Sequence, residues 1–351
     1  MSLGLLRLGD FRVLRAAELI LHPRLNLITG ANGSGKTTVL EAIYLLGRGR
    51  SFRNRHSEQL IRHGERRFWL HGRTAPAPGH LIGLACEVEN GLTVRVDERP
   101  ASSLAELSDV FPVQVIDPGI HRLVEDGPPQ RRRWLDWAVF HVEPQFVGAW
   151  QAYTRALQQR NAALKTGSDP KLWDHDLVRL GNLLTSARRR VVAQLQPHWS
   201  LAVSELDAVD ASLDFYQGWS QERSLEQALE AQLPKDRERG LTSVGPHRFE
   251  ILLRVSGRPA RDIVSRGQQK ILGAAMALSM ARCVAALAGR TPTLLLDDPA
   301  AELDPAHTRR LLSAVALLGG QLVVTALRPE DTALGLPDTV FHVEHGGVNR
   351  V

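Results

Sequence analysis

The stretch LNLITGANGSGKTTVLEAIYLL, residues 25–46, decides the fold of this chain. Its first residues form a short apolar run typical of a buried β-strand, and residues 38–46 have the composition of an α-helix. Between them lies GANGSGKT, which matches the pattern G-x-x-x-x-G-K-[ST] in full. A glycine-rich turn between a strand and a helix points backbone N–H groups at phosphate oxygens, and the helix N-terminus adds its positive end. The stretch therefore predicts a phosphate-binding loop in an α/β domain.

Each position of this loop has an expected role in binding a nucleoside triphosphate. Lys36 is expected to reach the β- and γ-phosphates, and the hydroxyl of Thr37 is expected to bind Mg²⁺. The remaining loop residues are expected to contact the nucleotide: Gly30, Ala31, Asn32, Gly33, Ser34, Gly35 and Thr38. The alternative is a chance glycine-rich turn before a helix, which the flanking strand and helix argue against.

A second motif, TLLLDD at residues 293–298, ends an apolar run with two adjacent acids. Two carboxylates at the end of a buried strand are costly in free energy unless they serve a cation. Asp297 is expected to hold Mg²⁺ through water, and Asp298 to orient or deprotonate the attacking water. A helix N-cap after the strand would explain one acid but not both. Lys36 and Asp298 are therefore the expected catalytic residues.

A third motif, SRGQQK at residues 265–270, opens an Ala-rich segment of helical composition. Ser265 is a natural N-cap, Gly267 permits close backbone approach, and a free helix N-terminus is a second phosphate-binding device. One nucleotide does not need two such devices from one chain. We therefore expect a head-to-tail pair, in which Ser265 of one subunit closes over the γ-phosphate held by the other. Gly267 and Gln268 are expected to bind nucleotide with it.

Length, charge and cysteine content limit the class of protein. The chain has 351 residues, enough for about two domains, with 43 Lys plus Arg, 38 Asp plus Glu and a formal charge of +5. Its cysteines, Cys86 and Cys283, lie far apart, which excludes a disulfide framework and a zinc ribbon and favours a reducing compartment. Charged or polar residues interrupt the apolar segments, so we expect no signal peptide, no membrane span and a cytoplasmic location.

The other segments predict an α/β nucleotide-binding head that is split by an insertion. Residues 131–233 are rich in Ala, Leu, Gln and Arg at helical spacing, with breaks at 166–170 and Pro197 and a return linker at 235–246. We expect a head made of residues 1–125 and 241–351, with a mainly helical lobe at 126–240. Strands are expected at residues 3–8, 13–21, 25–29, 68–72, 82–89, 93–96, 113–116, 248–255, 293–296, 322–325, 340–344 and 348–351.

The net positive charge is concentrated in residues 48–73, which we call the arginine-rich segment. It contains eight arginines and two glutamates, a local charge of +6, so the rest of the chain sums to −1. Arginine suits bidentate contacts with phosphate, and Phe52, Phe68 and Trp69 lie among the arginines. Candidate DNA contacts are Arg48, Arg50, Arg53 and Arg55. In the alternative interpretation the aromatics are core residues and half of the arginines are ordinary surface residues.

Together the motifs resemble an ABC-type ATPase. Residues 30–37 look like a Walker A motif, 265–268 like a signature, 294–298 like a Walker B motif and 301–304 like a D-loop. Lys36 and Ser265 are 229 positions apart, which is too far for an ABC transporter domain and too close for a full-length SMC protein. The spacing resembles that of the RecF family. The likeness covers nearly the whole chain, including LEAIY at 40–44, QRNAAL at 159–164 and GPH at 245–247.

This resemblance implies a DNA-binding ATPase that uses ATP and Mg²⁺ and forms a homodimer on nucleotide. Such a protein acts with RecO and RecR on single-stranded, double-stranded or gapped DNA, promoting RecA loading in recombinational gap repair and replication restart. The resemblance also implies that Arg12 lies near the nucleotide and that Gln114 is a Q-loop residue that binds the metal.

Departures from the transporter pattern predict slow hydrolysis used as a switch. Asp298 stands where transporters have Glu, Ala301 where the D-loop commonly begins with Ser, and Thr325 where transporters have a switch His. Two other functions stay open. A defence or nuclease-associated ATPase would add a C-terminal nuclease domain, for which the 26 residues after Thr325 leave no room. A DNA-binding scaffold with little hydrolysis is disfavoured by the acid pair but favoured by Ala301 and Thr325.

Overall fold

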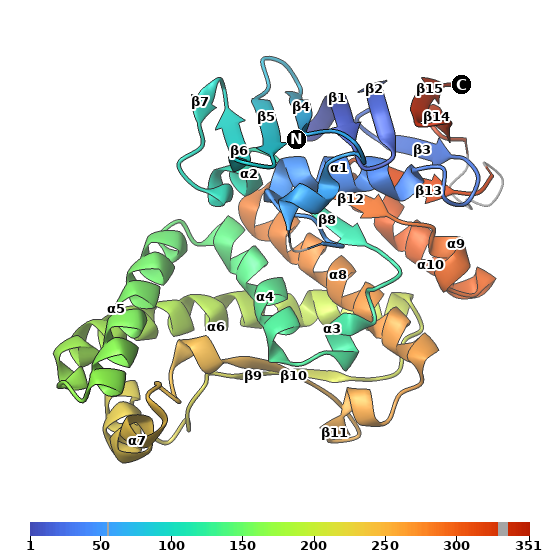
Figure 1. Ribbon diagram of the computed structural model, residues 1–351. Helices are drawn as coiled ribbons and strands as arrows, with labels where there is room; N and C mark the ends of the chain where they lie inside the picture. The colour runs from blue at the N-terminus through green and yellow to red at the C-terminus, as the bar shows by residue number, and fades with distance from the viewer. Residues whose placement is uncertain (55, 329–335) are drawn as a thin grey trace. The chain divides into compact units, whose positions relative to one another are not determined.

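The computed structural model describes residues 1–54, 56–328 and 336–351, and the chain divides into two compact units (Figure 1). The first unit comprises Met1–His121, Leu201–Ala208 and Arg266–Val351, and the second comprises Arg122–Ser200 and Val209–Ser265. Both ends of the chain thus build the first unit, in agreement with the expected split head. The boundary expected at 240 differs from the observed one at 265, because the strand at 250–255 pairs within the second unit.

A mixed sheet in the first unit brings the motif-bearing strands side by side. Its strand order is β15-β14-β3-β13-β12-β8, and all neighbours are parallel except β14 and β15. The strands are β3 (Leu25–Thr29), β8 (Val113–Ile116), β12 (Thr293–Leu296), β13 (Leu322–Ala326), β14 (Thr339–Glu344) and β15 (Gly347–Arg350). Because β13 lies between β3 and β12, the carboxyl ends of all three meet at one edge of the sheet.

The second sheet of this unit is antiparallel, in the order β2-β1-β4-β5-β6-β7. Its strands are β1 (Ser2–Phe11), β2 (Leu14–Ile20), β4 (Arg67–Ala75), β5 (Leu81–Glu87), β6 (Gly91–Val96) and β7 (Arg99–Pro100). Alternate residues of β4 and β5 are buried, as expected for strands with one face on the core. Helix α1 (Lys36–Arg48) shares one hydrophobic core with both sheets, in which Leu6, Leu40 and Val323 are all buried.

The other helices of the first unit include one of high hydropathy. They are η1 (Ser57–Leu60), α2 (Leu104–Val110), α8 (Arg266–Ala288), α9 (Pro299–Glu302) and α10 (Pro305–Ala316). Helix α8 is long and apolar enough to cross a membrane, but 78% of its apolar window is buried inside the protein. That burial is typical of a core helix.

The second unit contains helices and a small sheet. Its helices are α3 (Arg122–Glu125), α4 (Pro128–Val142), α5 (Phe146–Thr166), η2 (Pro170–Trp173), α6 (Asp174–Glu205, whose end belongs to the first unit), α7 (Leu225–Arg239), η3 (Pro246–Arg248) and η4 (Ala260–Asp262). Strands β9 (Ser212–Tyr216), β10 (Glu250–Val255) and β11 (Arg258–Pro259) form the sheet β11-β10-β9.

Two sequence-based boundaries in the second unit were wrong. Helix α6 continues through Pro197, where a break was expected, and α7 continues through Pro234 into the expected linker. A proline inside a helix removes one backbone hydrogen bond but does not end a helix that packs well on both sides of it. Trp199 and Ala202, just after Pro197, are buried, which explains why α6 persists. Strand β9 was missed because it lies within a region of helical composition.

Candidate nucleotide site

The loop between β3 and α1 has a backbone that requires glycine. Gly30, Gly33 and Gly35 have φ values of 149°, 79° and 116°, which L-residues with side chains rarely adopt. A Cβ atom on Gly30 would also come within 2.5 Å of the carbonyl oxygen of Val343 in β14. The expected glycine-rich loop therefore depends on tight packing against the sheet edge as well as on its own turn.

The side chain of Lys36 is folded into this loop. Its Nζ donates hydrogen bonds to the carbonyl oxygens of Gly30, at 2.7 Å, and Ala31, at 3.1 Å, and the residue is buried. Beside it, the hydroxyl of Ser34 is buried and has no hydrogen-bond partner among the described residues. A buried polar atom without a partner is costly in free energy. The loop thus offers an ammonium group and an unsatisfied hydroxyl to an anion.

Thr37 and Asp297 meet across the sheet edge. The Thr37 hydroxyl lies 2.9 and 3.0 Å from the two carboxylate oxygens of Asp297, although 260 positions separate the residues in sequence. Burial raises the pKa of Asp297, and hydrogen bonds from Thr325 and Thr37 partly counter this. A hydroxyl and a carboxylate in contact are ligands that suit Mg²⁺, which takes few protein ligands and keeps several waters. The structure brings together these two residues, both of which the sequence had named as metal ligands.

Thr325 links the two acids of the second motif. Its hydroxyl donates to Asp297 Oδ1 at 2.9 Å and accepts the backbone N–H of Asp298 at 2.8 Å. Asp298 has a left-handed backbone, with φ at 46°, and precedes α9. Its side chain makes no capping hydrogen bond to that helix within the described part of the chain, so the N-cap alternative does not account for it. Asp298 is only partly buried, which leaves its carboxylate accessible to water.

Gln114 does not lie with Thr37 and Asp297. It lies inside β8 opposite Leu294, three residues before Asp297 along the parallel register. Each residue of a strand advances about 3.3 Å, so Gln114 lies about 10 Å short of the sheet edge. Asp117, after the end of β8, instead lines a small cavity with Asp297 and Lys270. The metal-ligand role proposed for Gln114 therefore finds no support in its position.

Arg12 lies against the helix that follows the loop. Its guanidinium donates to both carboxylate oxygens of Glu41 at 2.7 Å and to Asn54 Oδ1 at 2.6 Å. The next residue, Val13, packs on the loop: a Cβ atom on Gly35 would lie 3.0 Å from Val13 Cγ2. Arg12 is thus next to the nucleotide loop, but its charge is directed at a carboxylate of α1.

The signature residues lie in an exposed turn. Ser265 directly precedes α8, Gly267 and Gln268 lie in its first turn, and all three are exposed. One turn further, Lys270 forms an ion pair with Glu302 at 2.6 Å, in the segment that resembles a D-loop. In that segment Ala301 is exposed, while Asp304 caps α10 by accepting the N–H groups of Ala306 and His307.

The arginine-rich segment is divided between several environments. Arg48 stacks on Tyr44, with its guanidinium carbon 5.7 Å from the ring centroid, and burial lowers its pKa. Arg50 is exposed. Arg53 is half exposed and lies 3.9 Å from Glu41, and Arg55 lies outside the described residues. Phe68 is fully buried in the core, as the alternative interpretation expected. Arg50 thus has the environment expected of a DNA contact, while Arg48 does not.

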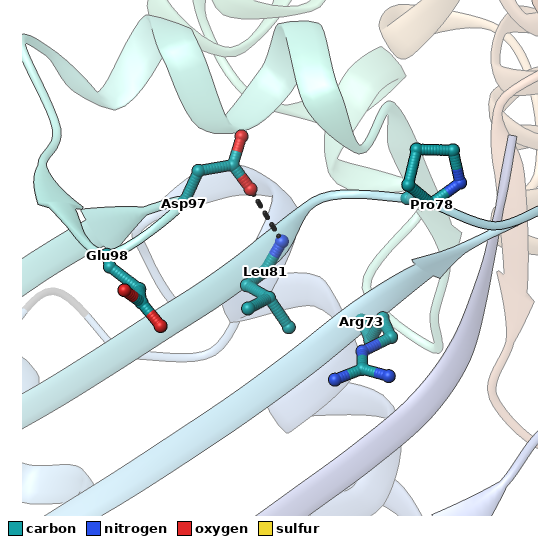
Figure 2. Close-up of a pocket in the computed structure, with 6 residues that line it drawn as sticks. Arg73, Pro78, Leu81, Asp97 and Glu98 are labelled. Atoms are coloured by element: carbon teal, nitrogen blue, oxygen red, sulfur yellow. Dashed lines mark hydrogen bonds between the residues drawn. The ribbon is translucent and has the colours of Figure 1, made fainter.

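The far end of the segment faces acids. Figure 2 shows Arg73 lining a pocket in the antiparallel sheet with Asp97 and Glu98. Asp97 accepts a hydrogen bond from the Leu81 N–H at 2.9 Å, and its contact with His80 lowers its pKa. Arg73 is exposed and shares this pocket with the two acids.

Two residues of the site carried only a weak or incomplete signal in the sequence. Thr325 stands at the end of a buried strand, but its contacts with both acids follow from the pairing of β13 with β12. Glu41 stands in the mostly apolar stretch 39–46 of α1, and a fully buried acid there indicates a cationic partner elsewhere in the chain. Either could have been suspected from a polar residue at an apolar position.

Comparison with known proteins covers nearly the whole chain. The family RecF/RecN/SMC N terminal domain matches residues 2–347. The chain is 36% identical over 361 residues to the DNA replication and repair protein RecF of Pseudomonas putida, covering 100% of this chain and 98% of that protein. The RecF of Pseudomonas aeruginosa is 36% identical over 361 residues with the same coverage.

Solved structures agree with this match. The recombination mediator protein RecF with ATP in the RecFOR pathway is similar with a TM-score of 0.89 and 25% identity, covering 100% of this chain and 97% of that one. A Pyrococcus furiosus Smc head domain, at a TM-score of 0.59 and 16% identity, covers 100% of this chain and 96% of that one. The Smc likeness extends to the fold alone.

Proposed function

Because the chain belongs to the RecF family, we propose that it is a slow ATPase that uses ATP and Mg²⁺ as a switch to bind DNA in recombinational gap repair and replication restart. The observation that carries this proposal is the contact between Thr37 and Asp297 beside the loop that holds Lys36. The loop after β3 and the acid after β12 are 260 positions apart in sequence, and the fold places them side by side. This placement suits a loop that binds phosphate next to a carboxylate that binds a metal ion.

The residues present fit ATP and Mg²⁺. A glycine-rich loop before a helix directs backbone N–H groups at phosphate oxygens, which also suit the unsatisfied Ser34 hydroxyl, and the Lys36 ammonium suits the β- and γ-phosphates. Thr37 and Asp297 would hold the metal. Bound Mg²⁺ supplies neutralisation of the charge that develops on the phosphoryl oxygens.

Asp298 is the proposed general base or water-orienting group. The hydrogen bond from its backbone N–H to Thr325 fixes the backbone from which the carboxylate projects. Thr325 is itself engaged with Asp297, so its hydroxyl has no free hydrogen to give to a γ-phosphate. Aspartate is also one methylene shorter than the glutamate of transporters. Both features support turnover well below the median of about 10 s⁻¹ for enzymes.

Dimerisation on ATP is the proposed means of switching. The exposed turn at Ser265, Gly267 and Gln268 supports contact with the nucleotide of a second copy, because a helix N-terminus attracts phosphate. The homodimer would bind gapped, single-stranded or double-stranded DNA through Arg50 and its neighbours. RecR and RecO are the proposed protein partners, with RecA loading as the outcome, since the ATP-bound relative is a mediator of the RecFOR pathway.

The test uses two variants, Lys36→Ala and Asp298→Asn, and one matched control. We expect Lys36→Ala to abolish ATP binding and the ATP-dependent rise in molecular mass, and the exposed Lys171→Ala to change neither. We expect Asp298→Asn to bind ATP, hydrolyse it at least tenfold more slowly and stay dimeric on gapped DNA. Light scattering and phosphate release measure both properties.

Two results would separate this proposal from its alternatives. If Asp298→Asn turned over ATP at the wild-type rate, the catalytic assignment would be wrong. If the wild-type protein bound ATP and DNA but released no phosphate, the ATPase switch would be wrong. The protein would then be a DNA-binding scaffold that is stabilised by bound nucleotide.

A further inference from the structure

A buried carboxylate on α1 stands next to the proposed nucleotide site without belonging to any of its motifs. Glu41 is fully buried, at 0% exposure, and accepts two hydrogen bonds from the Arg12 guanidinium at 2.7 Å each. The Ser51 hydroxyl donates to the same carboxylate. A buried carboxylate is costly in free energy unless it is paired and hydrogen-bonded, and Glu41 is paired from two directions.

The contact with Arg12 connects Glu41 to the loop between β3 and α1. Glu41 follows Thr37 by four positions, so both lie on one face of α1. Arg12 has a left-handed backbone, with φ at 56°, and its N–H donates to the Leu60 carbonyl at 2.8 Å. A non-glycine residue holds such a conformation only where its surroundings fix it. The turn at Arg12 is thus fixed between Glu41 and Leu60, with Val13 against the loop.

The other direction leads to the start of the arginine-rich segment. The Ser51 hydroxyl accepts the backbone N–H groups of Arg53 and Asn54, each at 2.9 Å. Asn54 in turn accepts a hydrogen bond from Arg12 at 2.6 Å. Arg53 lies 3.9 Å from Glu41. One carboxylate therefore holds the turn of residues 51–54, which the exposed Arg50 directly precedes.

We propose that Glu41 is a positioning residue that couples DNA contact at the 50–54 segment to nucleotide binding, by holding Arg12 and the turn of residues 51–54 against α1. The inference rests on the proposed function, because it requires that the chain bind both ATP and DNA. Coupling between two sites is reciprocal and typically changes affinity about 5–150-fold. Bound DNA should therefore tighten ATP binding, and bound ATP should tighten DNA binding by the same factor.

The experiment measures the ratio of the MgATP dissociation constants without and with DNA. A residue that only stabilises the fold would not change this ratio. The dissociation constant for MgATP is measured with and without a gapped DNA duplex at one salt concentration. We expect a ratio of about fivefold or more for the wild-type protein. For Glu41→Gln we expect a ratio within about twofold of one. Glu58→Gln makes the same chemical change at an exposed acid of the same segment and should keep the wild-type ratio.

Ser51→Ala guards against misfolding of the Glu41 variant. It removes one hydrogen bond to the carboxylate and leaves the Arg12 pair in place, so we expect a folded protein whose coupling ratio falls by at least half. If Ser51→Ala and a folded Glu41→Gln both keep the wild-type ratio, the positioning role is refuted. A wild-type ratio of one with intact binding of both ligands refutes the coupling alone. If the wild-type protein binds no ATP or no DNA, the proposed function itself is refuted.

Discussion

Replacement of Thr325 by valine is the perturbation that tests the candidate site most directly. Thr325 is fully buried, and its one hydroxyl serves both acids of the second motif, at 2.8 Å from Asp298 N and 2.9 Å from Asp297 Oδ1. Valine keeps the branched shape of threonine and removes only the hydroxyl. The substitution therefore removes two hydrogen bonds and leaves the packing around the side chain nearly unchanged.

The magnitude follows from those two hydrogen bonds. A hydrogen bond to a charged group contributes about 1.5–3 kcal/mol, and an unsatisfied buried N–H costs about 1–3 kcal/mol. Because both hydrogen bonds share one hydroxyl, their effects are not additive, and we expect the free energy of unfolding to fall by about 2–4 kcal/mol. The left-handed backbone of Asp298 is then no longer fixed by Thr325, so we expect ATP turnover to fall about tenfold, which corresponds to about 1.4 kcal/mol.

The same variant should shift the pH dependence in a defined direction. Burial raises the pKa of Asp297, and the hydrogen bond from Thr325 is the largest of the interactions that lower it. Removing that hydrogen bond raises the pKa further. Since Mg²⁺ would bind the ionised carboxylate, the acidic limb of the activity profile should move to higher pH. The direction would be opposite if the hydroxyl had stabilised the protonated acid.

The assay is single-turnover phosphate release across pH 5 to 8, with urea unfolding of the same samples. Thr325→Ser keeps the hydroxyl and is the matched control, for which we expect near wild-type turnover and an unshifted acidic limb. Turnover of Thr325→Val within twofold of the wild-type rate, with an unshifted limb, would refute the assignment of Thr325 to the two acids.

Two further predictions concern DNA binding and pH stability. Reversal of charge in Arg50→Glu should weaken DNA binding and lower the slope of log affinity against log salt, by about 0.9 for each phosphate that is no longer neutralised, whereas Arg237→Glu on α7 should leave the slope unchanged. His247 lies partly buried in the second unit: desolvation lowers its pKa to about 4 from 6.5, and its ring contacts Tyr153 and Thr242. In the unfolded chain His247 binds a proton below pH 6.5, whereas in the folded chain it binds one only near pH 4. The free energy of unfolding therefore has its full value above pH 6.5 and falls by up to about 3 kcal/mol as the pH falls toward 4. Urea unfolding at pH 7 and pH 4.5 measures this loss; a His247→Asn variant with the full wild-type loss would contradict it.

Local sequence patterns predicted the elements that carry the nucleotide site. Strands β3, β8 and β12 have the bounds expected from their apolar runs, because each is short, largely buried and ended by a polar residue. The contacts of Thr325 and Glu41 could not be predicted in this way. Thr325 contacts the two acids because β13 pairs with β12, and Glu41 contacts Arg12 from a turn that is distant in sequence. Local residue spacing predicts neither the order of strands in a sheet nor the partner of a side chain.

The arginine-rich segment shows how far a count of charges can mislead. Its local charge of +6 came from eight arginines and two glutamates within residues 48–73. Among the arginines that the structure describes, three lie beside acids from outside the segment: Arg62 is 3.6 Å from Asp10, Arg53 is 3.9 Å from Glu41, and Arg66 is 2.9 Å from Glu89.

Arg12, also outside the segment, already pairs with Glu41 at 2.7 Å, so only Asp10 and Glu89 are subtracted from +6, which leaves +4. Each neutralised phosphate of a duplex contributes about 0.9 to the salt slope, so four such phosphates at this segment of one protomer would account for a slope of about −3.6. A wild-type slope per protomer much steeper than this would require DNA contacts elsewhere on the chain. A slope near this value that becomes shallower by about 0.9 or more in Arg50→Glu would place the contacts in this segment.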